Sequence, residues 1–322
     1  MKIGVLTSGG DAPGMNAAIR AAVRQADALG HEAWGIHRGY QGLLEGDMAP
    51  LPSRACANIL QRGGTMLQTA RCPEFHEPAT RAKAAGNLKA AGIEALVVIG
   101  GDGSFRAAEA LQREHGVACA GIPGTIDNDL AGTERTLGFD TALNTAVEAI
   151  DRIRDTASSH GRLFLVEVMG RSSGMLAVHT ALACGAEAVL YPESPDDSYE
   201  VLVSQLEASW LRGKRSSIVV VAEGDTVGRA MAVGERLKRD HPLDLRVVVL
   251  GHVQRGGSPS AMDRIWGSRW GAEAVRRLDR GESGFYLGEV GGALVAQPIA
   301  MVLEPQPVPP GDLGRLVATL AR

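Results

Sequence analysis

ALVVIGGDGS, residues 95–104, and CAGIPGTIDND, residues 119–129, carry the strongest signal for the fold. Each is an apolar run followed by a glycine-rich, acidic segment, which is typical of a buried strand and its loop in a parallel α/β sheet. Ligands of such sheets bind beyond the carboxyl ends of the strands. Alternate side chains of an extended segment share a face, so we expect Thr125, Asp127 and Asp129 to point toward one substrate.

Strand-like and helix-like patterns alternate along nearly the whole chain, which predicts parallel sheets with crossover helices. The strands expected in a first unit are KIGVLT, ALVVIGG and VACAGIP, and those of a second are LFLVEVMG, EAVLYPE, SSIVVVAEG and RVVVLGHV. Helical patterns cover about 141–157 and 260–278, and the second would return to the first unit. A chain of 322 residues suits two α/β domains, with a boundary near Gly138. Pro305 to Pro310 is expected to be an extended crossing segment.

Composition argues against several classes of partner. Lys and Arg number 33 against 37 Asp and Glu, so no basic excess points to nucleic acid or a membrane surface. The four cysteines, Cys56, Cys72, Cys119 and Cys184, show no CxxC spacing, which indicates reduced thiols rather than a metal site or disulfides. No signal-type segment follows Met1, and no apolar run is long enough to span a bilayer, so we expect a cytoplasmic protein.

TSGGDAPGMNAAIR, residues 7–20, places Gly9 and Gly10 between a predicted strand and a predicted helix. Glycines at this position let backbone N–H groups approach a phosphate at the positive end of a helix. A tight strand-to-helix turn would use the same glycines. The segment is neither GxGxxG nor a Walker loop, because no GK[ST] follows.

The GGDGS segment is the stronger phosphate signal. Asp102 is flanked by Gly101 and Gly103 and followed by Ser104 at the start of a predicted helix. This arrangement offers a carboxylate to hydrated Mg²⁺ and backbone donors to phosphate oxygens. The alternative is a simple helix cap, since Asp and Ser are ordinary capping residues.

PGTIDND, residues 123–129, supplies the candidates for acid–base chemistry. Asp127 is our choice of general base, which would accept a proton from an attacking hydroxyl. Thr125 would orient the substrate, and Asp129 would support it or hold ordered water. The alternative is a turn cluster built from Asp-Asn-Asp.

Basic residues would neutralise the charge that phosphoryl transfer develops. Arg171 and the pair His252 and Arg255 are the strongest, because they follow predicted strands and are flanked by glycine. For any single arginine, a solvated surface position is the alternative. The full set of candidates is Arg71, Arg162, Arg171, Arg246, His252 and Arg255.

A second basic set lies elsewhere. Arg20 and Arg24 are four residues apart on one predicted helix face, and Arg212, Lys214 and Arg215 cluster in WLRGKRSS. Solvated surface explains most such runs. A regulatory anion site distant from the catalytic residues is the sharper alternative.

The motifs TSGGDAPGMNAAIR, GYQGL, ARCPEF, GGDGS, PGTIDND, EVMGR and GHVQRGGSP occur in order over roughly residues 1–270, and together they resemble the bacterial ATP-dependent 6-phosphofructokinases. The resemblance implies two Rossmann-like three-layer α/β/α domains with mainly parallel sheets and the active site in the cleft between them. The larger, ATP-binding domain would comprise 1–138 plus about 256–304. The smaller, fructose 6-phosphate-binding domain would comprise 139–255 plus about 305–322. A homotetramer would share active and effector sites between subunits.

The resemblance also implies an activity and site residues. The activity is Mg²⁺-dependent transfer from ATP to the 1-hydroxyl of fructose 6-phosphate, a phosphotransferase step of glycolysis. Catalysis would rest on Asp127, Arg71, Arg171 and Thr125. ATP would meet Gly10, Tyr40, Arg71, Cys72, Gly101, Asp102, Gly103 and Ser104, with Mg²⁺ on Asp102; Tyr40 would stack on the base or belong to the core. The sugar phosphate would meet Thr125, Ile126, Asp127, Asp129, Arg162, Met169, Gly170, Arg171, Glu223, Arg246, His252, Val253, Gln254 and Arg255, with Arg162 and Arg246 reaching from a neighbouring subunit.

Two further implications concern the donor and the regulation. Pyrophosphate-using relatives typically carry Asp at the position of Gly103 and Lys at that of Gly124, so glycine at both favours ATP. An effector site for ADP or phosphoenolpyruvate would use Arg20, Arg24, Arg154, Gly185, Glu187, Arg212, Lys214 and Arg215. Departures at Ser53, Arg54, Asn58 and Ser216 leave the sign and strength of regulation open, and the nucleotide preference around His76 and Arg106 is open as well.

Two other functions would account for part of these motifs. One is a kinase for another substrate, such as an NAD or lipid kinase, that shares only the GGDG loop. The EVMGR and GHVQRGG segments have no evident place in such an enzyme. The other is a nucleotide or sugar-phosphate sensor without turnover, which would have no use for Asp127 as a base.

Overall fold

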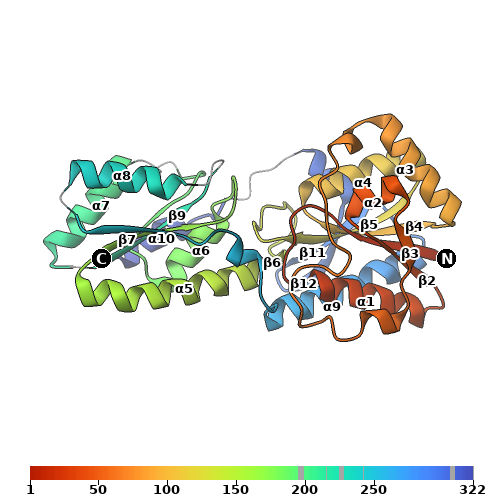
Figure 1. Ribbon diagram of the computed structural model, residues 1–322, viewed down its shortest axis with the longest axis horizontal. Helices are drawn as coiled ribbons and strands as arrows, with labels where there is room; N and C mark the ends of the chain where they lie inside the picture. Colours follow the sequence, from red (N-terminus) through yellow and green to blue (C-terminus); the bar gives the residue numbers. More distant parts are fainter. Residues whose placement is uncertain (195–198, 215, 225–227, 242, 305–308, 322) are drawn as a thin grey trace. The chain divides into compact units, whose positions relative to one another are not determined.

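Residues 95–104 form a buried strand followed at once by a helix. Strand β4 (Ala95–Gly100) is buried at all six positions, and α4 (Asp102–His115) begins two residues later. An unbroken apolar run is what a strand covered on both faces requires. In the computed structural model the described residues are 1–194, 199–214, 216–224, 228–241, 243–304 and 309–321 (Figure 1).

The chain divides into two units that each have a sheet of their own. The first unit comprises Met1–Ile126, Leu130–Thr141 and Arg255–Pro307, and the second comprises Asp127–Asp129, Ala142–Gln254 and Val308–Arg322. Both sheets are mostly parallel with helices on their faces, so the predicted α/β class with two units is confirmed.

The sheet of the first unit runs in the order β12-β11-β5-β4-β1-β2-β3, and β6 pairs with β5. The inner strands are parallel, whereas β3 and β12 pair antiparallel at the two edges. The sequence patterns did not single out β2, β3, β11 or β12. The bounds are β1 (Lys2–Thr7), β2 (Glu32–Ile36), β3 (Met48–Pro50), β5 (Ala118–Thr125), β6 (Leu137–Gly138), β11 (Phe285–Val290) and β12 (Ala293–Pro298).

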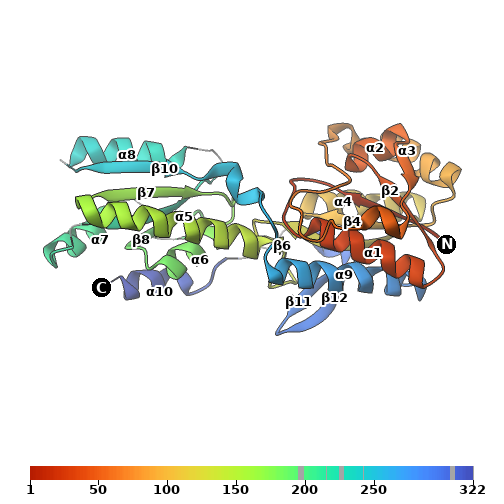
Figure 2. The same cartoon turned by 60° about the horizontal axis from the view of Figure 1, so that its bottom comes forward.

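Helices cover both faces of this sheet. Figures 1 and 2 show α1 (Met15–Ala28) and α9 (Ala261–Asp279) on one face, with α2 (Gly39–Glu45), α3 (Pro78–Ala91) and α4 on the other. Helices α1 and α9 pack closely because α9 carries glycine at the contact. A Cβ on Gly271 would lie 2.4 Å from the Ala18 carbonyl oxygen. Short 3₁₀ turns at Ser53–Cys56, Pro73–His76, Gly251–Arg255 and Ile299–Leu303 complete the connections.

The sheet of the second unit is wholly parallel, in the order β10-β7-β9-β8. Its strands are β7 (Leu163–Val168), β8 (Ala188–Leu190), β9 (Ser217–Ala222) and β10 (Leu245–Val249), which are the four strands that the sequence predicts. Helices α7 (Tyr199–Leu211) and α8 (Arg229–Asp240) cover one face, where their leucines join a common core with the strands. Helix α6 (Met175–Cys184) lies on the other face and packs against α10 (Leu313–Leu320).

Helix α5 (Phe139–His160) extends the helical pattern predicted for 141–157 at both ends, and α9 matches the pattern at 260–278. The segment Pro305 to Pro310, predicted to be extended, falls largely on 305–308, which lie outside the described residues. Among the helices that are described, none combines the length and the apolar character needed to cross a membrane.

Candidate active site

Three glycine-containing loops meet at the carboxyl edge of the first unit's sheet, because β1, β4 and β5 are parallel neighbours. A Cβ on Gly100 would lie 2.5 Å from the Ser8 carbonyl oxygen, and one on Gly9 would lie 3.5 Å from the Ser104 hydroxyl. A Cβ on Gly101 would lie 3.7 Å from Thr125 Cβ. The loops therefore abut one another, and at Gly100 only glycine allows the close backbone approach.

The side chain of Arg255, at the end of the 3₁₀ turn Gly251–Arg255, contacts the first of these loops. Its Nη1 donates to the carbonyl oxygen of Asp11 (3.1 Å), and a Cβ on Gly10 would lie 2.5 Å from the same Nη1. Gly10 and Arg255 were predicted to serve different ligands, ATP and the sugar phosphate. The structure places them in direct contact within the first unit.

A fourth segment, residues 65–72, is tied to the same edge by side chains that sequence reasoning missed. The Thr69 hydroxyl donates to the Gly9 carbonyl (2.8 Å), and the Thr7 hydroxyl donates to the Gln68 carbonyl (2.8 Å). The Asn16 side chain accepts from Met66 N (2.8 Å) and donates to the Arg62 carbonyl (3.0 Å). The signal was present in TSGGDAPGMN, where Thr7 and Asn16 are the polar residues that border the glycine turn.

Arg71 and Cys72 closely follow the residues that these hydrogen bonds hold against the first glycine loop. Arg71 is exposed two residues after Thr69, and Cys72 is half-buried at the start of the following 3₁₀ turn. Burial and the nearby Glu74 carboxylate raise the pKa of the Cys72 thiol. An exposed guanidinium at this edge is free of apolar cover and accessible to an anion.

Asp102 opens helix α4 with its side chain half-exposed. Both carboxylate oxygens accept from Arg106 Nε at 3.0 Å, an ion pair one turn along the helix. No group of three or more His, Cys, Asp or Glu side chains forms a metal-binding cluster within the described ranges. A single accessible carboxylate beside the glycine loops nevertheless fits Mg²⁺, which is commonly held by one or two carboxylates together with substrate phosphates and water.

The second unit contributes a buried carboxylate beside an arginine. Asp127 is 3% exposed, and Arg171 Nε lies 3.8 Å from its Oδ2. The Ser173 hydroxyl donates to the backbone carbonyl of Asp127 (2.9 Å), and Glu223 Oε1 accepts from the backbone N–H of Arg171 (3.1 Å). Asp127 and Arg171, predicted from two motifs, and Glu223, expected only from the family resemblance, are thus brought together.

The local backbone at PGTIDND corrects one expectation. Strand β5 ends at Thr125, the chain bends at Ile126 and Asp127, and Asn128 has φ 49°. The premise of an extended segment from Thr125 to Asp129, with alternate side chains on one face, is wrong for this reason. Asn tolerates the left-handed region better than most residues, because its short polar side chain can hydrogen-bond locally.

A buried side chain supports the strained backbone next to Arg171. Gly170 has φ 143° and Arg171 itself has φ 52°, both in the region that disfavours side chains. Met169 N donates to Gln254 Oε1 (3.1 Å), and the Gln254 side chain is fully buried. Gln254, predicted to touch the sugar phosphate, therefore uses its carbonyl oxygen to support Met169, whereas His252 and Val253 are exposed.

Arg162 and Arg246 lie elsewhere on the second unit. Both pair with Asp244, through Arg162 Nε at 2.7 Å and Arg246 Nη1 at 2.6 Å, and the hydrogen bond from Arg162 leads the interactions that lower the pKa of that carboxyl. They stand at the amino ends of β7 and β10, whereas Met169 and Arg171 follow the carboxyl end of β7. Six residues of strand separate these edges by about 20 Å. Within this chain the structure does not bring the two arginines to Arg171.

A family model described as Phosphofructokinase matches residues 2–278 of the chain. The chain belongs to the phosphofructokinase family. This confirms the resemblance inferred from the motifs.

Curated relatives in the family are similar over nearly the whole chain. The chain is 58% identical to ATP-dependent 6-phosphofructokinase 1 of Thermus thermophilus and 52% identical to ATP-dependent 6-phosphofructokinase of Bacillus subtilis, in each case over 303 residues that cover 94% of both proteins.

Solved structures in the family share the fold. Phosphofructokinase from Saccharomyces cerevisiae aligns with a TM-score of 0.87 at 34% identity, covering 99% of this chain and 47% of the yeast chain, so this chain spans about half the length of the yeast one. The pyrophosphate-dependent phosphofructokinase from Marinobacter aquaeolei aligns with a TM-score of 0.85 at 21% identity, covering 99% and 91%. The second likeness concerns the fold alone.

Tyr40 of this phosphofructokinase is a core residue. It is 4% exposed, its ring lies 4.4 Å from that of Phe75, and its hydroxyl donates to the Ser104 carbonyl (2.6 Å). Burial leads the effects that raise the pKa of Tyr40 well above its ordinary value. These observations favour the core alternative over stacking on adenine, and they give Tyr40 a part in holding the first turn of α4.

The predicted effector residues gather in two places. Arg154 Nη2 donates to the Cys184 carbonyl and, at 3.4 Å, to that of Gly185, while Lys214 Nζ contacts Glu187 Oε1 at 3.2 Å. Arg212 and Lys214 both donate to the Ala321 carbonyl, at 3.4 and 3.2 Å, so these residues share one end of the second unit. In the first unit, Arg20 and Arg24 project from α1 near Cys56, where their charges partly oppose the rise that burial gives its thiol pKa. Arg215 lies outside the described residues.

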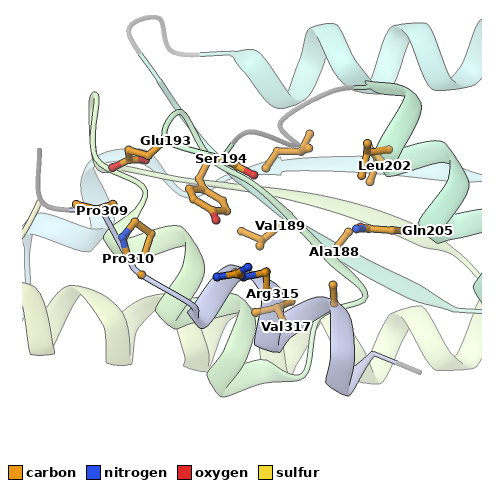
Figure 3. A pocket seen from close by; sticks show the side chains of 16 residues that line it. Ala188, Val189, Glu193, Ser194, Leu202, Gln205, Pro309, Pro310, Arg315 and Val317 are labelled. Carbon is orange, nitrogen blue, oxygen red and sulfur yellow. The ribbon is translucent and has the colours of Figure 1, made fainter.

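The second unit also contains a pocket of about 350 Å³. Figure 3 shows it lined by β8, the start of α7 and the C-terminal segment, with Glu193, Ser194, Gln205 and Arg315 among its polar residues. None of the predicted site residues lines it. The candidate active site therefore rests on the loops and their contacts.

Proposed function

We propose that this chain is an ATP-dependent 6-phosphofructokinase, which transfers the terminal phosphoryl group of ATP to the 1-hydroxyl of fructose 6-phosphate. The names of relatives at 52–58% identity over 94% of the chain support the reaction. The observation that carries it in the structure is the buried Asp127 carboxylate with Arg171 Nε 3.8 Å away. A base next to a cation is what deprotonation of a hydroxyl and phosphoryl transfer to it require.

The first unit supplies the donor side of the proposal. Backbone N–H groups of the abutting glycine loops and the exposed Arg71 would bind the ATP phosphates, as anions bind at helix N-termini. Asp102 would hold Mg²⁺ in exchange for its ion pair with Arg106. When bound, the metal would neutralise charge on the phosphate oxygens. We accordingly assign nucleotide binding to the larger unit.

The second unit supplies most of the acceptor side. Asp127 would take the proton of the 1-hydroxyl, Arg171 would stabilise charge on the moving phosphoryl group, and Glu223 would keep the Arg171 backbone in place. We propose that Arg162 and Arg246 bind the 6-phosphate of a sugar held by a neighbouring subunit of a homotetramer. Their distance from Arg171 along β7 supports this, because one sugar phosphate cannot span it within a single chain.

The choice of ATP rather than pyrophosphate rests on Gly103 and Gly124. A Cβ on Gly124 would lie 2.9 Å from Met15 Cε and 3.2 Å from Ile99 Cγ2, so a lysine there would force the buried Met15 to move. A Cβ on Gly103 would meet nothing within 4 Å, so an aspartate there would fit and add charge beside the phosphate loop. Glycine at both positions leaves the loop open for a nucleoside triphosphate.

We also propose that the two basic groups described above form an effector site for ADP or phosphoenolpyruvate in the assembled tetramer. The support is the grouping of Arg154, Glu187, Arg212 and Lys214 and the pairing of Arg20 with Arg24 on α1. Arg20→Ala would abolish the response to added effector while basal turnover stays nearly intact, and unchanged effector titrations would contradict the site. A cytoplasmic location stays part of the proposal, supported by four free thiols.

The deciding experiment measures fructose 1,6-bisphosphate formed from fructose 6-phosphate and Mg²⁺, in parallel with ATP and with pyrophosphate. Product with ATP alone is the expected result, and Asp127→Asn is the matched variant that should slow its formation by roughly two to four orders of magnitude. Product with pyrophosphate would overturn the donor assignment. No product with either donor, with nucleotide binding retained, would favour a sensor or a kinase for another acceptor.

A further inference from the structure

Asp263 is a buried carboxylate to which the proposed reaction assigns no part. It lies in the first turn of α9, 3% exposed, and its backbone N–H donates to the Ser260 hydroxyl that caps this helix (3.2 Å). Its side chain reaches away from α9. Oδ1 accepts from Gly138 N at 2.8 Å, and Oδ2 accepts from Thr141 N at 2.9 Å and from the Thr141 hydroxyl.

These three bonds hold the residues that border Thr125. Gly138 is paired with Thr125 where β6 joins β5, and the Thr136 hydroxyl donates to the Thr125 carbonyl (2.6 Å). Thr141 belongs to the first turn of α5. The carboxylate of Asp263 therefore fixes the short strand that supports the end of β5, two residues before Asp127.

The same node contacts the first glycine loop. A Cβ on Gly138 would lie 2.7 Å from Ala12 Cβ and 3.1 Å from Pro13 Cδ, and a Cβ on Gly14 would lie 3.1 Å from the Asp263 carbonyl oxygen. Both glycines have positive φ, 97° and 100° respectively. The donor loop, the strand beside Thr125 and the start of α9 thus meet around one side chain, packed too closely for a side chain at either glycine.

Ionisation fits this arrangement. Burial raises the pKa of Asp263 to about 6, while the bonds from Thr141 and Gly138 favour the charged form. Above that pKa, at neutral pH, the group is a carboxylate whose oxygens face three donors. An asparagine would turn an N–H toward one of these donors, leaving a buried polar pair mismatched.

We propose that Asp263 is a positioning residue for phosphoryl transfer, which sets the place of Thr125 and the following Asp127 by holding Gly138 and Thr141 against the donor loop. This inference rests on the proposed function. Displacement of a reacting group by a fraction of an ångström to an ångström is enough to slow a transfer that depends on alignment.

The test compares Asp263→Asn with Ser260→Ala in the full-length enzyme. Ser260→Ala removes the cap hydroxyl of the same helix and its hydrogen bond to Asp140 on α5, and it keeps the three bonds of the Asp263 side chain. It therefore tests whether loss of another contact between α9 and α5 has the same effect. For Asp263→Asn we expect kcat to fall roughly 10- to 100-fold with KM for ATP within about threefold. We also expect a larger share of ATP to be hydrolysed per sugar phosphorylated. Ser260→Ala should keep kcat within about twofold of the wild type, even if its thermal midpoint falls as much as that of Asp263→Asn.

Two outcomes would overturn the proposal: a folded Asp263→Asn with kcat near that of the wild type, or equal kcat losses in both variants at equal loss of thermal midpoint. If Asp263→Asn fails to fold, Thr141→Val removes the hydroxyl that donates to Asp263 and accepts from Ser260 N, and unchanged kcat in that variant would also contradict the proposal. Amide hydrogen exchange over residues 125–141 provides a second measurement that does not depend on catalytic activity. Faster exchange is expected there in the Asp263 variant and to a smaller extent in Ser260→Ala, which loses the bond to Asp140 but keeps those of Asp263. Failure of the phosphofructokinase assignment and failure of the positioning role therefore remain distinguishable.

Discussion

Arg255 rests on Gly10, with its Nη1 placed 2.5 Å from where a Cβ of that residue would stand and 3.1 Å from the carbonyl oxygen of Asp11. A loop proposed to bind ATP thus contacts an arginine, on the 3₁₀ turn Gly251–Arg255, that is proposed to bind the sugar phosphate. The absence of a side chain at Gly10 is what allows this contact.

Gly10→Ala should therefore push the Arg255 guanidinium away from the loop. Because the atom displaced is the far end of a flexible side chain, we expect little loss of stability but a fall of at least about tenfold in kcat/KM. Steady-state kinetics and thermal unfolding measure the two effects. Gly86→Ala is the control, since that glycine is exposed in α3 with nothing within 4 Å of its Cβ position, and there alanine should raise stability slightly without touching the kinetics. Unchanged kinetics in Gly10→Ala would argue against the contact.

Asp127→Asn should lower kcat by roughly two to four orders of magnitude, the usual worth of a positioned general base. Nucleotide binding should change little, because Asp127 belongs to the second unit and the loops proposed to bind the ATP phosphates belong to the first. Rapid-mix kinetics and equilibrium binding of ATP test the two statements. Asp312→Asn, at an exposed carboxylate that pairs with Arg315, is a control that should leave both unchanged. Wild-type turnover in Asp127→Asn would remove the base assignment.

Arg171→Gly and Arg171→Ala should lose activity to the same extent yet differ in stability. Arg171 has φ 52°, a conformation that costs a residue with a side chain about 1 kcal/mol and glycine almost nothing. The glycine variant should thus be more stable than the alanine variant by about 1 kcal/mol, measured by denaturant unfolding. Equal stabilities would mean that the backbone relaxes out of the left-handed region once the guanidinium is gone.

ATP should protect Cys72 from alkylation. Burial and Glu74 raise its thiol pKa, so the thiolate is scarce at neutral pH and the reaction should accelerate as the pH rises toward the thiol pKa. Burial raises the pKa of Cys184 to about 11 and that of Cys119 to about 12, so both should react more slowly still. Mass-spectrometric mapping after maleimide treatment under mildly alkaline conditions gives the rates. Cys184, in the second unit, is the internal control, and equal labelling of Cys72 with and without ATP would contradict its place at the donor site.

Much of the fold follows from local pattern. The unbroken apolar run before GGDGS predicts β4, and the four apolar runs between residues 163 and 249 predict the whole sheet of the second unit, because strands buried on both faces leave a signal that needs no context. Strands β2, β3 and β12 escaped prediction because strands toward the edges of a sheet are partly exposed. Strand β11 is buried at five of six positions, but Gly288 and Glu289 interrupt its apolar run. The motif order was enough to assign the family, which the matched family model confirms.

Side-chain partnerships were beyond the sequence. Nothing local in PGTIDND shows that the chain bends after Thr125, or that Asn128 takes φ 49°, since either an extended or a turned backbone satisfies those residue types. Tyr40 shows the same limit: an aromatic residue after a glycine could stack on a base or fill a core, and only the packing of Phe75 and the Ser104 carbonyl around it settles that it is buried.

Local sequence was enough for most of the order of strands and helices, for the glycine loops at the strand ends and for the membership of the family, because hydrophobic periodicity and glycine placement act over a few residues. Which distant groups meet was set by the packed fold alone. Arg255 reaches Asp11 across 244 positions and Asp263 reaches Gly138 across 125, and such contacts depend on how parallel strands align their carboxyl ends and how α9 packs on α1. A buried carboxylate or guanidinium pairs with the groups that the packed elements bring within hydrogen-bond distance. The local sequence pattern does not identify these partners, because they lie far away along the chain.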